Sequence, residues 1–452
     1  MKHHAQTAPS SLVLAVSMCL AVFGGVPPGS ASSVEPLTAN KVRAAAAELA
    51  ELLEGNYLFP EIASQYATHL RSRLEAGAYD AMDSPRELAD LLERELNALH
   101  ADAHLRVRPT EASESESNGP RRVRGIPQGP ALSGARWFGD DVAYVAVNLL
   151  PGDAVSRQAM ADFLDEYDGA RALILDLRSC PGGTLAVMDV LFARLFGERT
   201  HLVTMDTRVE AERRGGAVFD GTPTLTREPA PDGIVRRYHW AVPNDPVSSW
   251  AEVPVYVLTG STGSACEHLS MALRVSERAT LIGTATGGAG HYGGLRDFGD
   301  GEFNVFVPVG RTYDPRTGQD WEGTGVAPHI ETSAEAALDR VLEELGIEPD
   351  PVEAIEDAGD YLGTYGNRRV TSDGGKLFMQ RIDVAAEGAQ TGPRRRVAPR
   401  LELRLVGEDE FELPRIPGAK VRFERDSSGA VVKIAVLQRD GRWEEAERTA
   451  DG

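Results

Sequence analysis

The stretch that decides the fold is VPVYVLTGSTGSACEHLSMALR, residues 253–274. It opens with an apolar run rich in β-branched residues (253–258), which predicts a buried strand. The small, glycine-bearing residues 259–263 allow a sharp turn, and from Ala265 onward apolar residues recur at helical spacing. Ser264 is therefore predicted at a strand-to-helix turn, beside the free N–H groups and the positive dipole end of a helix N-terminus.

Ser264 has two interpretations at such a turn. Its hydroxyl can cap the helix by accepting from a backbone N–H, which is the commoner role. It can instead be a nucleophile held on rigid elements, with an oxyanion stabilised by the helix N-terminus. Ser261 is the alternative nucleophile in the same turn. The second interpretation requires a base, a group that orients the base and oxyanion donors elsewhere in the chain.

Length and composition exclude several classes of function. The chain has 452 residues, enough for two or three domains, and its 42% hydrophobic and 25% charged content is typical of globular proteins. A formal net charge of −21 argues against nucleic acid or an anionic membrane as partner, because both require a basic surface. Cys19, Cys180 and Cys266 are too few for a disulfide scaffold and lack the spacing of a zinc site.

The N-terminus has the pattern of a secretion signal. Lys2 precedes an apolar run at residues 12–23 that is too short to span a bilayer, and small residues at 29–31 suit a cleavage site. We expect cleavage near Ala31 and a periplasmic or secreted mature protein. No later segment reaches about 18 apolar residues, so no integral membrane span is expected.

The rest of the chain divides by the periodicity of its apolar residues. Leucine-rich segments at helical spacing, one opened by the capping box SPRE at residues 84–87, predict an N-terminal three-helix module. Alternating strand and helix patterns predict an α/β domain with a mainly parallel, helix-covered sheet. Strands that alternate apolar and charged residues predict a small C-terminal antiparallel β domain. The predicted parts are a signal peptide (1–31), a helical domain (36–107), a linker or lid (109–135), the α/β core (136–346, with strands at 202–205 and 303–309 and a closing helix at 332–345), a linker (347–359) and the β domain (360–448).

Two histidines are candidates for the base. His104 follows the third predicted helix, and His291 lies in the glycine-rich segment GGAGHYGG, residues 287–294. Each also fits an ordinary surface, capping or loop role, which is commoner for a single histidine. A base with the pKa of free histidine, about 6.5, would make kcat/KM rise with pH through that value.

Two further segments offer the remaining groups. The predicted strand LILDLRSCPGG ends in Gly182 and Gly183, whose backbone can approach a ligand closely, although a tight strand-to-helix turn would use the same residues. Glu322, in WEGTGVAP, places a carboxylate beside tryptophan and glycines. GAGHYG (288–293) matches the dinucleotide fingerprint only formally, because a strand follows it, and no HExxH or metal-ligand spacing occurs. Neither a cofactor nor a metal is predicted.

Taken in chain order, the motifs resemble one family, the tail-specific (C-terminal-processing) serine peptidases. The resemblance is to the branch that includes the repeats of interphotoreceptor retinoid-binding protein and shares a catalytic core with tricorn protease, and it covers about residues 40–346. It implies a crotonase-like or ClpP-like peptidase core. The motifs are NYLFPE (56–61), DAH (102–104), LDLR with the following glycine pair (175–183), TGSTGSACE (259–267), TGGA (286–289) and WEGTGVAP (321–328).

The resemblance also implies roles for individual residues. Ser264 matches the nucleophile, and the N–H of Ala265 with one from Gly182 or Gly183 matches the oxyanion hole. Many members carry a lysine in a Thr-x-Gly-Lys-Gly motif, but this chain has TGGAG at residues 286–290, so a Ser–Lys dyad is not expected. His104 matches the tricorn-like base and Glu322 the acid that completes its relay; His291 is kept as a substrate-binding residue or alternative base.

The sequence thus predicts a secreted or periplasmic serine peptidase that acts on a peptide or protein substrate through a Ser-His-Glu relay. Two alternatives stay open, a non-catalytic protein that binds apolar ligands on the same fold and an esterase-type hydrolase, and the oligomeric state is undetermined. Cys180 and Cys266 lie two residues from Gly182 and Ser264, so they are expected to be neighbours in space. Two buried free thiols are favoured over a disulfide, because pairing needs converging Cβ vectors.

Overall fold

The computed structural model describes residues 36–110, 129–215, 219, 221–348, 352–382, 400–437 and 441–449. The predicted signal peptide and most of the predicted linker or lid at 109–135 lie outside these residues. Everything described below belongs to one compact unit, residues 37–452. Within the described ranges, no helix is long and apolar enough to cross a membrane.

Three helices form the N-terminal region: α1 (Ala39–Asn56), α2 (Pro60–Glu75) and α3 (Pro85–Leu99). The serine half of the predicted capping box opens α3, where the Ser84 hydroxyl accepts from the Glu87 N–H at 3.3 Å. The apolar faces of these helices share one hydrophobic core with strand β11 (Phe303–Tyr313), so the helices cover one face of a sheet.

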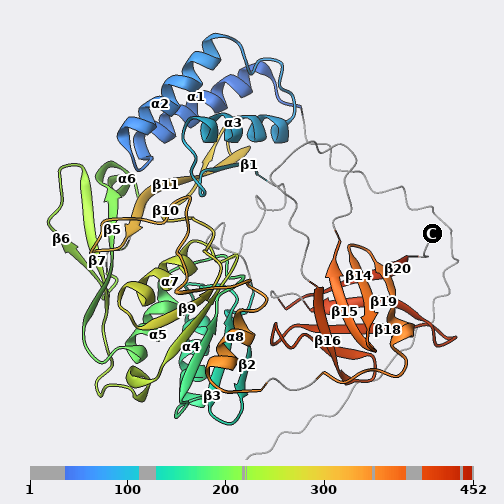
Figure 1. The fold of residues 1–452 in the computed structure, drawn as a ribbon. Coiled ribbons are helices and arrows are strands. Elements are labelled where there is room, and N and C mark those ends of the chain that lie inside the picture. The colour runs from blue at the N-terminus through green and yellow to red at the C-terminus, as the bar shows by residue number, and fades with distance from the viewer. Residues whose placement is uncertain are drawn as a thin grey trace, which may run out of the picture. The chain divides into compact units, whose positions relative to one another are not determined.

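A mainly parallel sheet forms the centre of the structure, as predicted. Its strand order is β12-β9-β8-β4-β3-β2, and only β2 at the edge is antiparallel. Alternate residues of its buried strands enter two different cores, one shared with α4, α5 and α7 and the other with α8, so helices cover both faces (Figure 1). Its elements are β2 (Leu132–Phe138), β3 (Val142–Val147), α4 (Ala154–Glu166), β4 (Ala172–Asp176), α5 (Ala186–Leu195), β8 (Val255–Thr259), α7 (Ala265–Val275), β9 (Ala279–Gly283), β12 (Ile330–Glu331) and α8 (Ala337–Glu344).

A second sheet departs from the prediction. The strands expected at 202–205 and 303–309 lie in β5 and β11 of a separate antiparallel sheet of order β1-β11-β5-β7-β6, with β10 also paired to β11. Strand periodicity identifies a strand but not its partner, and these partners are distant in sequence. The closing helix expected from residue 332 begins only at Ala337, as α8. The remaining elements here are β1 (Arg106–Pro109), β5 (Thr200–Arg208), α6 (Val209–Arg213), β6 (Leu225–Glu228), β7 (Ile234–Ala241), η2 (Ser249–Glu252) and β10 (His291–Phe298).

The C-terminal region is a closed antiparallel barrel of strands β13 to β20. Each strand pairs with its sequence neighbours, and β13 pairs with β20 to complete the closure, so no strand is left as an open edge. Aromatic and aliphatic side chains fill its interior. Its elements are η3 (Ala358–Tyr361), β13 (Gly363–Tyr365), β14 (Arg368–Asp373), β15 (Lys376–Arg381), β16 (Arg400–Gly407), β17 (Glu410–Glu412), β18 (Lys420–Arg425), β19 (Val431–Leu437) and β20 (Trp443–Thr449).

Candidate active site

Ser264 lies in the turn between β8 and α7, immediately before the first helical residue. Its backbone has φ 49° and ψ −121°, a conformation that non-glycine residues rarely adopt and that costs on the order of 1–3 kcal/mol. The Ser264 Oγ lies 3.0 Å from Nε2 of His104, a residue 160 positions earlier in the chain. The strained turn therefore presents the hydroxyl to an imidazole, as a nucleophile requires.

Glu267 holds this turn in place. Its buried carboxylate accepts from the Ser264 N–H at 2.8 Å, the Thr286 hydroxyl at 2.6 Å, the Gly288 N–H at 2.7 Å and the Ala289 N–H at 2.8 Å. Burial raises the pKa of Glu267, and these hydrogen bonds oppose the shift. No role of Glu267 was predicted from the sequence, although an acid among the apolar residues of a helix is a signal that could have indicated one.

Gly182 closes the other side of Ser264. An added Cβ on Gly182 would lie 2.7 Å from the Ser264 Cβ and 3.0 Å from the Ala265 nitrogen. Among the described residues, the N–H groups of Ala265, Gly182 and Gly183 donate no hydrogen bond. The groups proposed for an oxyanion hole are thus beside the candidate nucleophile. Gly183 is equally constrained, because its added Cβ would lie 2.0 Å from the carbonyl oxygen of Leu150.

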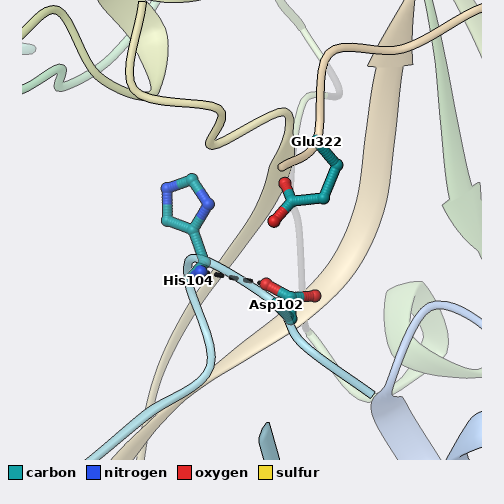
Figure 2. Close-up of side chains that lie close together, drawn as sticks. All are labelled: Asp102, His104 and Glu322. Carbon is teal, nitrogen blue, oxygen red and sulfur yellow. Dashed lines mark hydrogen bonds between the residues drawn. The ribbon is translucent and has the colours of Figure 1, made fainter. Parts of the chain in front are cut away.

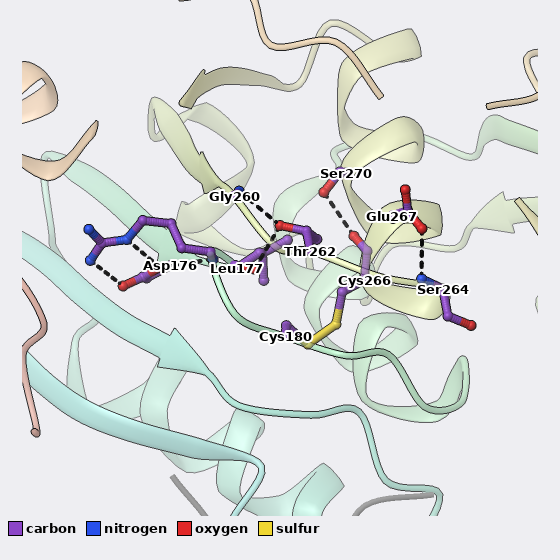
Figure 3. The surroundings of a disulfide bond; sticks show 10 residues. Asp176, Leu177, Cys180, Gly260, Thr262, Ser264, Cys266, Glu267 and Ser270 are labelled. Carbon is purple, nitrogen blue, oxygen red and sulfur yellow. Dashed lines mark hydrogen bonds and ion pairs between the residues drawn. A yellow bond between two sulfur atoms is a disulfide. The ribbon is translucent and has the colours of Figure 1, made fainter. Parts of the chain in front are cut away.

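Cys180 and Cys266 form a disulfide, with their Cα atoms 6.1 Å apart. They are neighbours, as expected, but the preference for two free thiols was wrong. Sequence alone gives no Cβ direction, and here the two side chains converge, as the bridge in Figure 3 shows. The bridge joins the segment that carries Gly182 to the helix that follows Ser264.

His104 lies in the segment between α3 and β1. Its backbone N–H donates to Asp102 at 2.9 Å, and its ring stacks on Phe306 with centroids 5.1 Å apart and planes inclined by 28°. Burial lowers the pKa of His104 from its ordinary 6.5 to about 4, and the nearby charge of Asp102 only partly opposes this. Among the described residues, the buried Nδ1 atom has no hydrogen-bond partner. At neutral pH the imidazole is therefore neutral and able to accept a proton.

Glu322 faces the same ring. Figure 2 shows its carboxylate on the side of the His104 imidazole that bears a ring nitrogen. The carboxylate accepts from the N–H groups of Ala103 at 2.7 Å, Gly290 at 2.7 Å and His291 at 3.1 Å. Glu322 thus joins the segment that carries His104 to the residues at the start of β10.

Asp102 and His291 form a buried pair close to His104. Asp102 accepts from Nδ1 of His291 at 2.7 Å and from the Tyr57 hydroxyl at 2.9 Å. Desolvation alone would lower the pKa of His291, but the hydrogen bond and charge of Asp102 outweigh it and raise the pKa. Desolvation alone would raise the pKa of Asp102, but the bond to His291 outweighs it and lowers the pKa. His291 is therefore occupied by Asp102, whereas the ring bonded to Ser264 is His104.

The carboxylates and the imidazole also have the chemistry of metal ligands. One ligand atom each from Asp102, His104 and Glu322 lie within 4.8 Å of one another. The carboxylate oxygens of Asp102 and Glu322 accept hydrogen bonds from N–H and O–H donors of the protein. Such a hydrogen-bond network can also position a histidine that acts as a base. Their arrangement fits proton transfer at Ser264 without requiring a metal.

Comparison with known proteins gives two family matches in chain order. A family model described as peptidase family S41 matches residues 141–332, and one described as the N-terminal domain of peptidase S41 in eukaryotic IRBP matches residues 34–133. Together they cover well over half of the chain and confirm the resemblance inferred from its motifs.

Solved structures with a similar fold include a lipoprotein from Streptococcus agalactiae, with 14% identity, a TM-score of 0.44, and coverage of 69% of this chain and 98% of that one. A photosystem II D1 C-terminal processing protease has 17% identity, a TM-score of 0.41, and coverage of 68% and 98%. Tricorn protease has 14% identity, a TM-score of 0.41, and coverage of 68% and 37%. On the two family matches, the chain belongs to peptidase family S41 and is a serine-type peptidase.

Proposed function

We propose that this peptidase cleaves its substrate with Ser264 as nucleophile and His104 as general base. The observation that carries the proposal is the 3.0 Å approach of Ser264 Oγ to His104 Nε2 between two segments 160 residues apart. A neutral imidazole takes the hydroxyl proton as Oγ attacks the substrate carbonyl carbon. The N–H groups of Ala265 and Gly182 or Gly183 then stabilise the oxyanion.

The same groups serve the remaining steps of the reaction. The His104 imidazolium gives its proton to the leaving amine as the peptide C–N bond breaks, which leaves an acyl group on Ser264. A water molecule that loses its proton to His104 attacks the acyl carbon; the bond from that carbon to Ser264 Oγ then breaks, His104 returns the proton to Oγ, and the new carboxyl terminus is released. In this proposal the negative charges of Glu322 and Asp102 stabilise the imidazolium that forms twice in each cycle.

We further infer that the protein acts in the periplasm or outside the cell. The apolar N-terminal segment predicts export, and a disulfide between Cys180 and Cys266 is stable in an oxidising compartment. Both observations favour a site of action beyond the cytoplasm. N-terminal sequencing of the purified native protein tests this inference, because cleavage near Ala31 is expected.

Covalent labelling by a fluorophosphonate, followed by mass-spectrometric mapping, tests the catalytic assignment. The expected adduct is on Ser264, and Ser264→Ala abolishes it while Ser261→Ala does not. Labelling of Ser261 in place of Ser264 would reassign the nucleophile. The absence of any adduct on the folded protein would favour a ligand-binding role on this fold, and a panel of ester and peptide substrates separates an esterase from a peptidase.

A further inference from the structure

Phe306 lies on the face of β11 opposite to the one that bears Phe303, Val305, Val307 and Val309. Val305 and Val307, its neighbours, point into the core shared with the N-terminal helices. Because side chains alternate along a strand, Phe306 points to the opposite face, where it remains half-buried. On that face it is paired with Arg106 of β1 and Leu295 of β10.

The Phe306 ring covers one face of the His104 imidazole. The two centroids are 5.1 Å apart and the planes differ by 28°, which is a stacked arrangement. Polar contacts hold His104 less completely than is usual for a catalytic base. Its Nε2 contacts Ser264, but its Nδ1 has no hydrogen-bond partner among the described residues. A single side-chain hydrogen bond does not fix the plane of the ring.

The charged groups around His104 do not fix the ring plane either. Asp102 bonds the backbone N–H of His104 and not its ring, Arg106 bonds Glu93, and His291 bonds Asp102. Glu322 faces the ring edge but accepts from backbone N–H groups. These groups act on the charge of the imidazole, whereas the stack acts on its orientation.

We propose that Phe306 is a positioning residue, which sets the plane of the His104 imidazole so that Nε2 stays aimed at Ser264. The inference rests on the proposed role of His104 as base. Stacking on an aromatic face restricts rotation of the ring and also favours the imidazolium, because the ring face carries negative charge density. The residue acts through His104 and does not contact the reacting atoms.

Three variants test the proposal by steady-state kinetics. Phe306→Leu keeps apolar volume but removes the stack, and it is expected to lower kcat by about 10- to 100-fold with little change in KM. Phe306→Tyr, which keeps the aromatic face, is expected to restore most of kcat. Phe303→Leu is the control, because Phe303 lies on the same strand, on the face that packs against Phe298, and its loss should lower Tm without lowering kcat.

A spectroscopic measurement separates this proposal from the proposed function. In the full-length Ser264→Ala protein, the ring protons of His104 should be shifted upfield by the Phe306 ring current, and Phe306→Leu should remove that shift. A KM increase with unchanged kcat in Phe306→Leu would overturn the proposal in favour of a substrate contact, as would equal kcat in the Leu and Tyr variants. If His104→Ala keeps full activity, the assignment of the base fails, while the ring-current result still reports the stack.

Discussion

Gly182 and Ser264 approach so closely that no side chain fits between them: a Cβ on Gly182 would lie 2.7 Å from the Cβ of Ser264. Gly182 also has a φ of 121°, which side chains disfavour. Gly182→Ala should therefore displace the segment of Gly182 and Gly183 and move an N–H group away from the proposed oxyanion hole, lowering kcat/KM by about 10²- to 10³-fold. Stopped-flow or steady-state kinetics with circular dichroism of the same sample checks this.

Gly139→Ala is the matched control for Gly182→Ala. Gly139 also has a positive φ, 57°, but an added Cβ there would meet no atom within 4 Å. Its substitution should cost about 1 kcal/mol of stability and leave kcat/KM unchanged. Full activity in Gly182→Ala would show that this loop does not serve the reaction.

Two substitutions of Ser264, the proposed nucleophile, should separate the effect of its hydroxyl on kcat from the effect of its strained backbone on stability. Ser264→Ala and Ser264→Gly should both lower kcat by about 10⁴-fold or more, because both remove the hydroxyl. Glycine tolerates φ 49°, ψ −121° without strain, so Ser264→Gly should be more stable than Ser264→Ala by about 1 kcal/mol in denaturant unfolding. A less stable glycine variant would contradict the strained turn.

The lowered pKa of His104 moves the expected acid limb of the pH profile. Because burial brings the pKa of His104 to about 4, the imidazole should stay unprotonated, and kcat/KM constant, well below pH 6.5. Activity should fall only as the pH approaches about 4. This differs from the ordinary histidine pKa expected from sequence, and a limb centred near 6.5 would show that the base is more solvated than the structure indicates.

Asp102 and His291 should make the free energy of unfolding depend on pH, with losses at both low and high pH. The pKa of Asp102 is lowered, so its contribution is present above 3.8 and is lost as the pH falls through the lower folded value. The pKa of His291 is raised, so its contribution is complete below 6.5 and is lost as the pH rises through the higher folded value. Urea unfolding across this pH range should therefore show a plateau between the two limits.

Asp102→Asn should remove most of this pH dependence. It should also lower the free energy of unfolding by about 3–5 kcal/mol, the usual loss when a buried ion pair loses one partner. Asp141→Asn is the control, because Asp141 pairs with Arg171 at the surface, with both side chains more than two-fifths exposed, and should cost less than about 1 kcal/mol. Equal losses in the two variants would contradict the importance of burial.

The disulfide should stabilise the whole domain. It closes a loop between residues 86 positions apart, for which the chain-entropy model gives roughly 4–5 kcal/mol. The double variant Cys180→Ala with Cys266→Ala should lower the free energy of unfolding by an amount of that order. Both cysteines are fully buried, so dithiothreitol should reduce the native protein slowly and the urea-unfolded protein fast. Reduction at equal rates would argue against the bridge.

Local signals in the sequence were sufficient where one segment determined its own structure. The turn that bears Ser264, the cap at Ser84 and the parallel strands of the core all follow from residues adjacent in the chain. The resemblance to a known family then predicted that His104, rather than His291, serves Ser264, and the structure places that histidine against the serine hydroxyl. That contact spans 160 positions, which no local pattern encodes.

What was missed depends on pairing between distant segments. The second sheet joins β5 to β11, about a hundred residues apart, and a period of two gives no information on the partner strand. Glu267 and Asp102 lay in the motifs of the family resemblance but had no predicted role of their own, because most of their hydrogen-bond partners lie in distant segments. Phe306 lay within the strand expected at 303–309 and had no predicted role, because alternation along a strand defines a face but not what lies opposite it.

The segments that carry Ser264 and His104, the proposed nucleophile and base, are anchored in different hydrophobic cores, and this has a consequence for how activity is lost. The segment of Ser264 is anchored in the core around the parallel sheet, through Cys266 and Leu269, whereas His104 is followed by Leu105 in the core of the N-terminal helices. Activity should therefore depend on how these two cores are held relative to each other within the one compact unit. On heating, loosening of the core around the N-terminal helices should abolish activity before the parallel sheet unfolds, with loss of the part of the helical circular dichroism signal that α1, α2 and α3 contribute.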